Sequence, residues 1–422
     1  MLECVIVGGG IHGTYLAQRL LEETHLQRED VLIVDPNEQL LASFRRKARA
    51  CDMEGLRSTF VHHVGTDPFG LESFAEGQDR EDELLSTQGY PRRPSLSLFL
   101  DYADDVIART DLSALHRRAA VRSIDRPADE TGLVLETTDS SSYNSVDAPS
   151  DAVDERIHVR TCVFAIGHGG RYHRPAWAQD LEAIAHVWDG DGAPEETDGE
   201  TIVVGGGITA AQLALCLCEG DDVTLLSRGE LEEAAIEADP RWINWNHTDS
   251  QLHRYPPGSQ TRYETVREAR NDGTVPPRLA ERLESAREAD ELTIRHGEVR
   301  SARTVAGRVR LLLAKGGYCS GDRVVLATGF EPVFEHPFVD RVADSLALER
   351  GYRGMPVLDD ETLAWRDERG NASPVYVTGA LAAGTVGPLA GNIAGARRAA
   401  DRITGALECR PRRPAPAVST NV

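Results

Sequence analysis

The chain has 422 residues, a length typical of two or three domains, and 41% of them are hydrophobic, which excludes a wholly disordered protein. Acidic residues outnumber basic ones by 68 to 46, for a net charge of −22, so nucleic acid is not an expected partner. No stretch approaches the ~18 consecutive apolar residues of a membrane span, and the first residues lack the basic start of a signal peptide. We therefore expect a cytoplasmic protein.

The charged residues are unusually biased. Only two of the 46 cations are lysines, Lys47 and Lys315, and the rest are arginines. Together with the acidic excess, this bias suggests an acidic surface of the halophile type. The seven cysteines form no Cys-x-x-Cys pair, so we expect buried, reduced thiols. No spacing of histidines and cysteines predicts a metal site.

The first 35 residues are typical of a strand, a glycine turn, a helix and a second strand. Gly8, Gly10 and Gly13 fit G-x-G-x-x-G: the first permits a tight turn, the second lets the backbone approach a diphosphate, and the third lets the helix pack on the strand. Asp35 closes the second strand, where a carboxylate can bind a ribose diol. The predicted dinucleotide contacts are Gly8, Gly10, Ile11, His12, Gly13 and Asp35. The alternative is a turn needed only for packing.

The same pattern returns in the middle of the chain. Gly205 and Gly207 are followed by Ala210, an allowed variant of the third glycine. The second strand here ends in Ser227 and Arg228 rather than in an acid, and a guanidinium can pair with a 2′-phosphate. The pattern favours NADPH, although Glu230 leaves some NADH use open and Arg228 could be a solvated surface residue. The predicted contacts are Gly205, Gly207, Ile208, Thr209, Ser227 and Arg228.

Two dinucleotide sites on one chain indicate two cofactors that exchange electrons, usually FAD and a nicotinamide. The predicted fold class is α/β, with two Rossmann-like, three-layer dinucleotide-binding domains. Short strand-like runs between residues 119 and 163 predict an antiparallel β-meander.

Three further segments resemble the flavoproteins with two dinucleotide-binding domains: 164–167, 324–329, and 375–379 followed by 387–400. The resemblance implies an FAD-binding domain made of residues 1–168 and 330–407, with an NAD(P)H-binding domain at 169–329. The Pro-rich end, 408–422, is expected to be a disordered tail. Small residues before the last helix would let the backbone approach a flavin edge, although a plain packing cluster is the alternative. The added cofactor contacts are Ala327, Thr328, Gly329, Gly379, Gly387, Pro388 and Asn392.

A narrower resemblance is to the lysine and ornithine N-monooxygenases, through residues 56–63, 67–69, 93–102 and 394–400. It implies an enzyme that reduces FAD with NADPH and then uses O₂ to form a C4a-hydroperoxide that oxygenates a small-molecule amine. Residues 55–100 hold no lysine, which that family commonly uses to hold a substrate carboxylate. His62 and His63 are the candidate catalytic residues, and Arg57 is a candidate cation beside a phosphate or the flavin; for each, a structural or surface role is the alternative.

Three functions remain open at this stage. The first is an NADPH-dependent flavin monooxygenase, and the second is a flavin reductase or dehydrogenase that passes electrons to a protein or quinone. The third, a flavin-binding sensor, is disfavoured because a sensor needs no hydride donor. Ala380 stands where disulfide reductases usually place an Asp, which argues against disulfide reduction. The sequence carries no signature of an oligomer.

Overall fold

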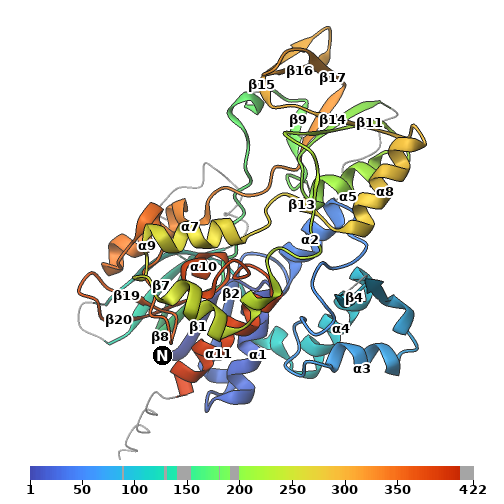
Figure 1. Cartoon of the computed structure of the whole chain (residues 1–422). Helices are drawn as coiled ribbons and strands as arrows, with labels where there is room; N and C mark the ends of the chain where they lie inside the picture. The colour runs from blue at the N-terminus through green and yellow to red at the C-terminus, as the bar shows by residue number, and fades with distance from the viewer. Residues whose placement is uncertain (88–89, 128–130, 140–153, 180, 191–198, 409–422) are drawn as a thin grey trace, which may run out of the picture.

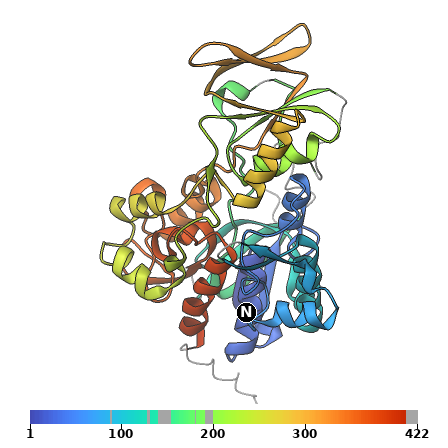
Figure 2. The ribbon, with the colours of Figure 1, turned by 45° about the vertical axis from the view of Figure 1, so that its right-hand side comes forward.

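The structure is a computed structural model that describes residues 1–87, 90–127, 131–139, 154–179, 181–190 and 199–408. Two lobes, each built on its own parallel β-sheet, are visible in Figure 1 and again, turned by 45°, in Figure 2. The predicted α/β class with two dinucleotide-binding folds is confirmed. Glu408 is the last residue of the final helix, and the predicted tail from residue 409 lies outside the described residues.

The first sheet has the strand order β19-β20-β8-β1-β2-β5, and the strands from β20 to β5 run parallel. The predicted meander is confirmed: β6 and β7 pair antiparallel and β7 pairs with the first half of β8. The strands of this lobe are β1 (Leu2–Val7), β2 (Val31–Asp35), β3 (Leu84–Thr87), β4 (Tyr90–Pro94), β5 (His116–Arg118), β6 (Ala120–Asp125), β7 (Leu133–Thr138), β8 (Glu155–Phe164), β19 (Ala364–Arg366) and β20 (Ala372–Val377).

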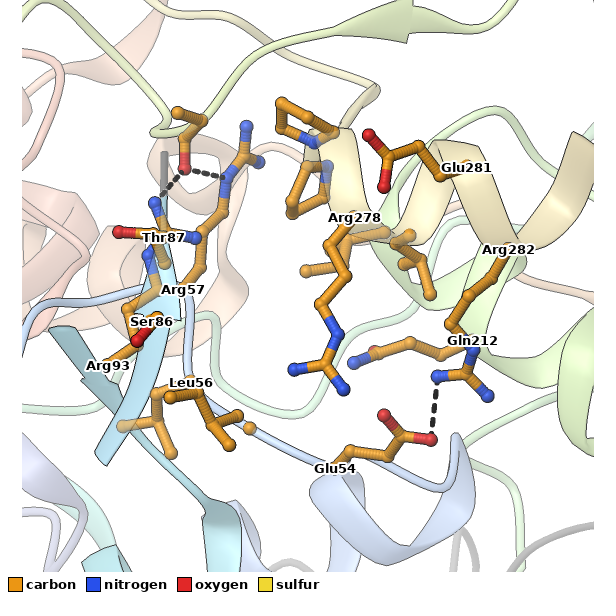
Figure 3. Close-up of a pocket in the computed structure, with 17 residues that line it drawn as sticks. Glu54, Leu56, Arg57, Ser86, Thr87, Arg93, Gln212, Arg278, Glu281 and Arg282 are labelled. Atoms are coloured by element: carbon orange, nitrogen blue, oxygen red, sulfur yellow. Dashed lines mark hydrogen bonds and ion pairs between the residues drawn. The ribbon is translucent and has the colours of Figure 1, made fainter. Parts of the chain in front are cut away.

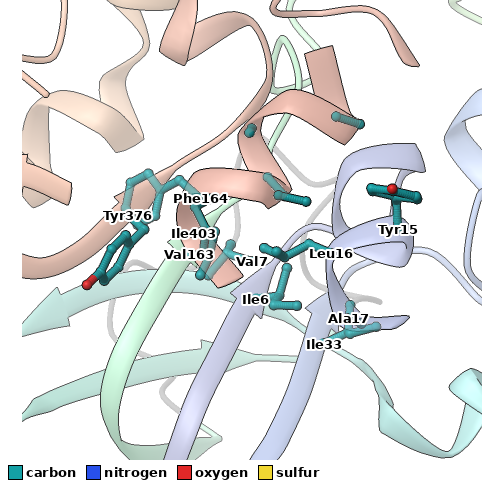
Figure 4. Packing of buried hydrophobic residues seen from close by; sticks show 14 of the residues in the cluster. Ile6, Val7, Tyr15, Leu16, Ala17, Ile33, Val163, Phe164, Tyr376 and Ile403 are labelled. Atoms are coloured by element: carbon teal, nitrogen blue, oxygen red, sulfur yellow. The ribbon is translucent and has the colours of Figure 1, made fainter. Parts of the chain in front are cut away.

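Helices cover this sheet because its central strands are apolar on both faces. Figure 4 shows Ile6, Leu16 and Phe164 in one continuous core, and all three are at most 2% exposed. The last helix lies along the first, where Arg19 pairs with Asp401 at 3.0 Å. The helices of this lobe are α1 (Ile11–Glu23), α2 (Ala42–Ala50), α3 (Gly70–Gly77), α4 (Leu96–Arg109), α9 (Pro337–Leu346), α10 (Ala383–Val386) and α11 (Ile393–Glu408).

The second sheet has the order β14-β11-β10-β18-β9, with all neighbours parallel. Helices α5 and α8 pack on one face, and an antiparallel sheet of β15, β16 and β17 packs on the other. Its strands are β9 (Ile184–His186), β10 (Glu200–Val204), β11 (Asp222–Ser227), β14 (Leu292–His296), β15 (Val299–Val305), β16 (Arg308–Leu313), β17 (Tyr318–Gly321) and β18 (Arg323–Leu326). Its helices are α5 (Ile208–Leu217) and α8 (Pro277–Glu288).

Residues 232–275 run between the lobes and pack against the end of the chain. Arg262 is fully buried and binds Asp360 through two hydrogen bonds of 2.6 and 2.7 Å. This connection contains β12 (Glu232–Glu233), α6 (Trp245–Thr248), α7 (Gln260–Ala269) and β13 (Thr274–Val275). No helix among the described residues is both long and apolar enough to cross a membrane.

Candidate dinucleotide sites and the cleft between them

The first glycine turn is built by close backbone packing. Gly8 has a φ of 113°, and a Cβ there would lie 2.4 Å from the Ala165 carbonyl oxygen. A Cβ on Gly13 would lie 1.9 Å from the Gly8 oxygen, whereas one on Gly10 would meet nothing within 4 Å. Gly8 and Gly13 are therefore required by the protein's own packing. The open space at Gly10 is where a diphosphate would approach the start of α1.

Asp35 braces this turn from the end of β2. It is buried; its Oδ2 accepts a hydrogen bond from the Gly9 N–H at 2.7 Å, and its Oδ1 accepts from the Asn37 N–H at 2.8 Å. Oδ1 also accepts from the Asn37 side-chain amide at 2.7 Å, so it is Oδ2, with one of its two lone pairs unused, that keeps capacity for a ribose hydroxyl. The carboxylate thus has a structural role that does not conflict with the predicted ligand role.

The end of the chain returns to the first turn. His12 Nδ1 lies 2.8 Å from the Thr378 hydroxyl, and burial lowers the pKa of His12 to about 4, so the ring is neutral at physiological pH. Gly379, the next residue, has a φ of 79°. The structure therefore brings predicted contacts from both ends of the sequence, Gly8–Gly13 and Gly379, to one edge of the sheet.

The loop before α11 is held by the connection between the lobes. Gly387 has a φ of 98°, and a Cβ there would lie 3.0 Å from the Trp242 ring. The Pro388 carbonyl accepts a hydrogen bond from Arg270 at 2.7 Å. Asn392 begins the helix by accepting from the Ala396 N–H at 3.0 Å. The sequence did not single out Arg270, because nothing local to residue 270 indicates its contact with this loop.

The second glycine turn repeats the geometry of the first. A Cβ on Gly205 would lie 2.6 Å from the Ala327 carbonyl oxygen and 2.9 Å from the Ala210 Cβ. Gly207 caps α5, with Ile208 and Thr209 as its first residues. Gly205 is thus required by this packing, as Gly8 is in the first turn. The start of α5 opens at the carboxyl edge of the second sheet, where dinucleotides bind in such sheets.

Arg228 lies just after β11 with its side chain exposed, and it makes no hydrogen bond or ion pair within the part of the chain that the structure describes. Its neighbour Ser227 is buried, and its hydroxyl lies 2.9 Å from His296 Nδ1. The structure therefore leaves the Arg228 guanidinium free for an anion, whereas Ser227 is engaged by the protein.

The two crossovers between the lobes pair with each other and form what we call the crossover ribbon, residues 171–173 and 328–331. Tyr172 and Phe330 form an antiparallel bridge, and the His173 N–H donates to the Gly329 carbonyl at 2.9 Å. The Thr328 hydroxyl donates to the His173 carbonyl at 2.5 Å. The predicted contacts Thr328 and Gly329 therefore lie at the junction of the two lobes.

Lys47, one of the two lysines, lies against the crossover ribbon. Its ammonium nitrogen is 5.1 Å from the centre of the Phe330 ring, 5.8 Å from that of Tyr172 and 5.9 Å from that of Trp188. Burial lowers the pKa of Lys47 to about 8, and Arg46 adds to the shift. The three rings attract the cation, whereas burial disfavours its charged form.

Lys47→Met is therefore expected to stabilise the protein, and more at pH 7 than at pH 10. The folded pKa of about 8 lies below the ordinary 10.5, so the unfolded state binds more protons between these values and wild-type stability rises with pH across that window. Methionine does not titrate, so its advantage is largest below pH 8. Urea unfolding at both pH values measures the difference. Exposed Lys315→Met is the control, and an equal gain for it would contradict the argument.

A cavity of about 420 Å³ opens between the lobes, and Figure 3 shows its lining. The start of α5 contributes Ile208, and the first lobe contributes Arg57 and Arg93. Arg278, at the start of α8, points into the space, while Arg282 is paired with Glu54 at 2.6 Å. The lining holds four arginines and two glutamates, so the cavity is suited to an anionic ligand despite the acidic chain.

Arg57 spans the two lobes. It donates hydrogen bonds to the Ala234 carbonyl at 2.6 Å and the Thr274 hydroxyl at 2.8 Å, and Arg93 donates to the Ala235 carbonyl at 2.7 Å. Burial, opposed by Glu237 and reinforced by Arg93 and Arg270, lowers the pKa of Arg57. The structure therefore places Arg57 in the wall of the cleft, bound to backbone oxygens.

The two candidate catalytic histidines have different surroundings. His63 is fully buried: its Nδ1 accepts from the Gly65 N–H at 3.1 Å, so Nε2 carries the proton and donates to the Pro68 carbonyl at 3.2 Å. Burial lowers its pKa to about 4. His62 is partly buried, 3.3 Å from the Thr59 hydroxyl, and burial and Arg397 lower its pKa to about 4. His63 has no nitrogen left for a substrate, whereas His62 keeps Nε2.

Two parallel sheets, each with a glycine turn at its carboxyl edge and joined by two crossovers, define the class of proteins with two dinucleotide-binding domains. Residues 5–148 match a family model described as FAD-NAD(P)-binding. No curated protein matches the sequence of this chain.

Solved structures share this fold over nearly the whole chain. The chain is similar to an ornithine hydroxylase from Pseudomonas aeruginosa (TM-score 0.72, 19% identity, covering 96% of this chain and 98% of that one). It is also similar to an L-lysine 6-monooxygenase from Pseudomonas syringae, with a TM-score of 0.70 and 17% identity, covering 97% of this chain and 99% of that one. A bacillithiol disulfide reductase from Staphylococcus aureus is similar as well, with a TM-score of 0.62 and 15% identity, covering 96% of this chain and 98% of that one. The predicted resemblance is confirmed at the level of the fold.

Proposed function

We propose that the chain is an FAD-dependent oxidoreductase that takes electrons from NADPH and acts as a flavin monooxygenase on a small-molecule amine, with O₂ as co-substrate. One observation carries the pairing of the two cofactors. Gly8 packs on Ala165 and Gly205 packs on Ala327, and the chain segments that follow these two alanines pair with each other in the crossover ribbon. Both glycine turns therefore adjoin the same junction.

The residues present fit both cofactors. For FAD, the open space at Gly10, the braced Asp35 carboxylate and the left-handed Gly379 suit a diphosphate, a ribose and a close backbone approach. For NADPH, the free Arg228 guanidinium suits the 2′-phosphate. We propose the domain boundaries 1–168 and 330–407 for FAD and 169–329 for NADPH, with residues 232–275 reaching across to the first lobe.

FAD, when bound, would supply the two-electron chemistry that neither histidine nor arginine can perform. The chain's own contribution is to position the cofactors and the substrate and to exclude water. The N-terminus of α11 would direct its positive end toward the flavin, and Arg57 and Arg278 would attract anionic groups into the cleft. Neutral His62 is the group we propose to face the substrate, since His63 is engaged on both nitrogens.

The oxygenase is favoured over the reductase by the resemblance of residues 56–63 and by the ornithine and lysine enzymes among the similar structures. A disulfide reductase is also among them, so the reductase that uses a protein or quinone acceptor stays as the alternative.

Stopped-flow mixing of reduced holoprotein and NADP⁺ with O₂ separates the oxygenase from the reductase. An oxygenase is expected to give a transient near ~380 nm, and a screen of amines should then raise NADPH consumption. Reoxidation in a single featureless phase would eliminate the oxygenase.

Arg228→Glu tests the nicotinamide site. We expect the KM for NADPH to rise at least ~10-fold, because a carboxylate would repel the 2′-phosphate, while the KM for NADH changes much less. Steady-state NAD(P)H oxidation measures both constants. Exposed Arg369→Glu, far along the chain, makes the same change of charge as a control. Equal effects on the two coenzymes would remove the 2′-phosphate role.

A further inference from the structure

The outer face of the β15-β16-β17 sheet is basic. Arg303 and Arg310 are directly opposite each other in the antiparallel register, so their side chains lie on one face. The Arg310 guanidinium lies 4.4 Å from the centre of the Tyr318 ring, and Tyr318 is 49% exposed. Arg295 donates to the Tyr318 carbonyl at 3.1 Å. We call these four residues the basic face.

This face is not needed to fold the sheet. Val309, Leu311 and Cys319 alternate with it in the strands and fill the core on the inner side. Two like charges opposite each other destabilise a strand pair. Among the described residues, neither Arg303 nor Arg310 has a carboxylate partner, although acids exceed bases in the chain by 68 to 46. Arg308, on the same face, is paired with Glu200.

The basic face has a counterpart on the other lobe. Residues 292–323 hold seven cations and two acids, whereas residues 70–83 hold six acids and one cation. In residues 70–83, which we call the acidic segment, Glu76, Asp79, Glu81 and Asp82 are exposed and have no ion pair within the described part of the chain. Figures 1 and 2 place β16 and α3 at opposite ends of the molecule, so one molecule cannot bring the two together.

We propose that the basic face of one copy of this chain docks on the acidic segment of a second copy. Arg303 and Arg310 on one surface, and Glu76, Asp79, Glu81 and Asp82 on the other, have no ion pair among the described residues, so the two surfaces are complementary in sign. Arginine and tyrosine are among the residues enriched at the centres of protein interfaces. Since the two surfaces differ, the contact is head-to-tail and leaves a free surface at each end of a pair.

Sedimentation velocity of the full chain across a range of concentrations tests the contact. In ~50 mM salt the wild type is expected to associate, and in ~1 M salt, where the screening length is about 3 Å, it should be monomeric. The double variants R303E/R310E and E81R/D82R should each be monomeric in low salt. Mixed together they should associate again, because the unchanged acidic surface of R303E/R310E then meets the unchanged basic face of E81R/D82R. The control variant R267E/R369E makes the same change of charge at two exposed positions outside both surfaces, and it should behave as wild type.

Circular dichroism verifies that each variant is folded, and the four substituted side chains of the two surfaces lie at the surface or on the outer face of a sheet. A wild type that stays monomeric in low salt at ~100 μM, well above the Kd of a specific contact, would overturn the proposal. So would mixed variants that fail to associate, which would point to another acidic protein as the partner of the basic face. None of these measurements depends on bound FAD, so their outcome is independent of the proposed reaction.

Discussion

Gly13→Ala is expected to destabilise the protein by about 3 kcal/mol or more and to leave little soluble protein. The added Cβ would lie 1.9 Å from the Gly8 carbonyl oxygen, which is backbone and cannot rotate away. Relief requires α1 to move off the first sheet, and with it the contacts of Leu16 and Leu20 in the core. Urea unfolding of the apoprotein, followed by far-UV circular dichroism, measures the loss.

Gly10→Ala is the matched control, and it separates packing from binding. Nothing lies within 4 Å of the added Cβ, and Gly10 has a φ of −74°, which alanine adopts without strain. We expect stability to change by less than ~0.5 kcal/mol, while FAD affinity falls at least ~10-fold because the methyl group occupies the path of the diphosphate. Fluorescence titration of the apoprotein with FAD measures the affinity. Unchanged affinity would mean that this turn serves packing alone.

Asp360→Asn is expected to cost about 3–5 kcal/mol of stability. Arg262 is 0% exposed, and its guanidinium binds both oxygens of Asp360 and the Tyr255 carbonyl. Without the carboxylate, a buried cation faces only neutral acceptors. The pair joins α7 of the connection to the first lobe, so residues 232–275 should be the first to lose protection in hydrogen exchange.

Two variants test the cause of that loss. Glu335→Gln removes the carboxylate from an exposed pair with Arg353, both partners being about half exposed, and should cost less than ~1 kcal/mol. Arg262→Met combined with Asp360→Asn removes both charges and should recover part of the stability lost by Asp360→Asn alone. If the double variant is less stable than Asp360→Asn, the loss comes from the packing of the arginine side chain and not from its unpaired charge.

The parts of the fold that could be predicted are those written in local patterns. The glycine turns at Gly8 and Gly205 and the apolar strands before them appear within some thirty residues of sequence each, because a βαβ unit is a local structure. The β15-β16-β17 sheet was not predicted, although Arg308 and Arg310 alternate with Val309 and Leu311 in β16 as the pattern of a half-buried strand requires. The hairpin of β3 and β4 was also not predicted, because β4 has only five residues and two of them, Pro91 and Pro94, are prolines, which argue against a strand.

For the candidate site, the sequence predicted cofactor contacts by motif but could not distinguish the surroundings of His62 from those of His63. Adjacent in the sequence, they differ because Gly65 and Pro68 fold back on His63 alone. Nor could it find Arg270, which carries no motif and reaches the Pro388 carbonyl only because residues 232–275 cross to the first lobe, or Arg278, which lines the cavity from the start of α8.

By itself the sequence determined that two dinucleotide-binding units follow each other on this chain and that the second lacks an acid after its second strand. Such signals depend on neighbouring residues and on backbone φ angles, which sequence dictates directly. Only the tertiary structure decided that both turns adjoin one crossover ribbon, that four arginines line the cleft between the lobes, and that Arg303 and Arg310 share one face without a carboxylate partner in the described part of the chain. These features join residues tens to hundreds of positions apart, and their contacts exist only once the sheets have formed and docked.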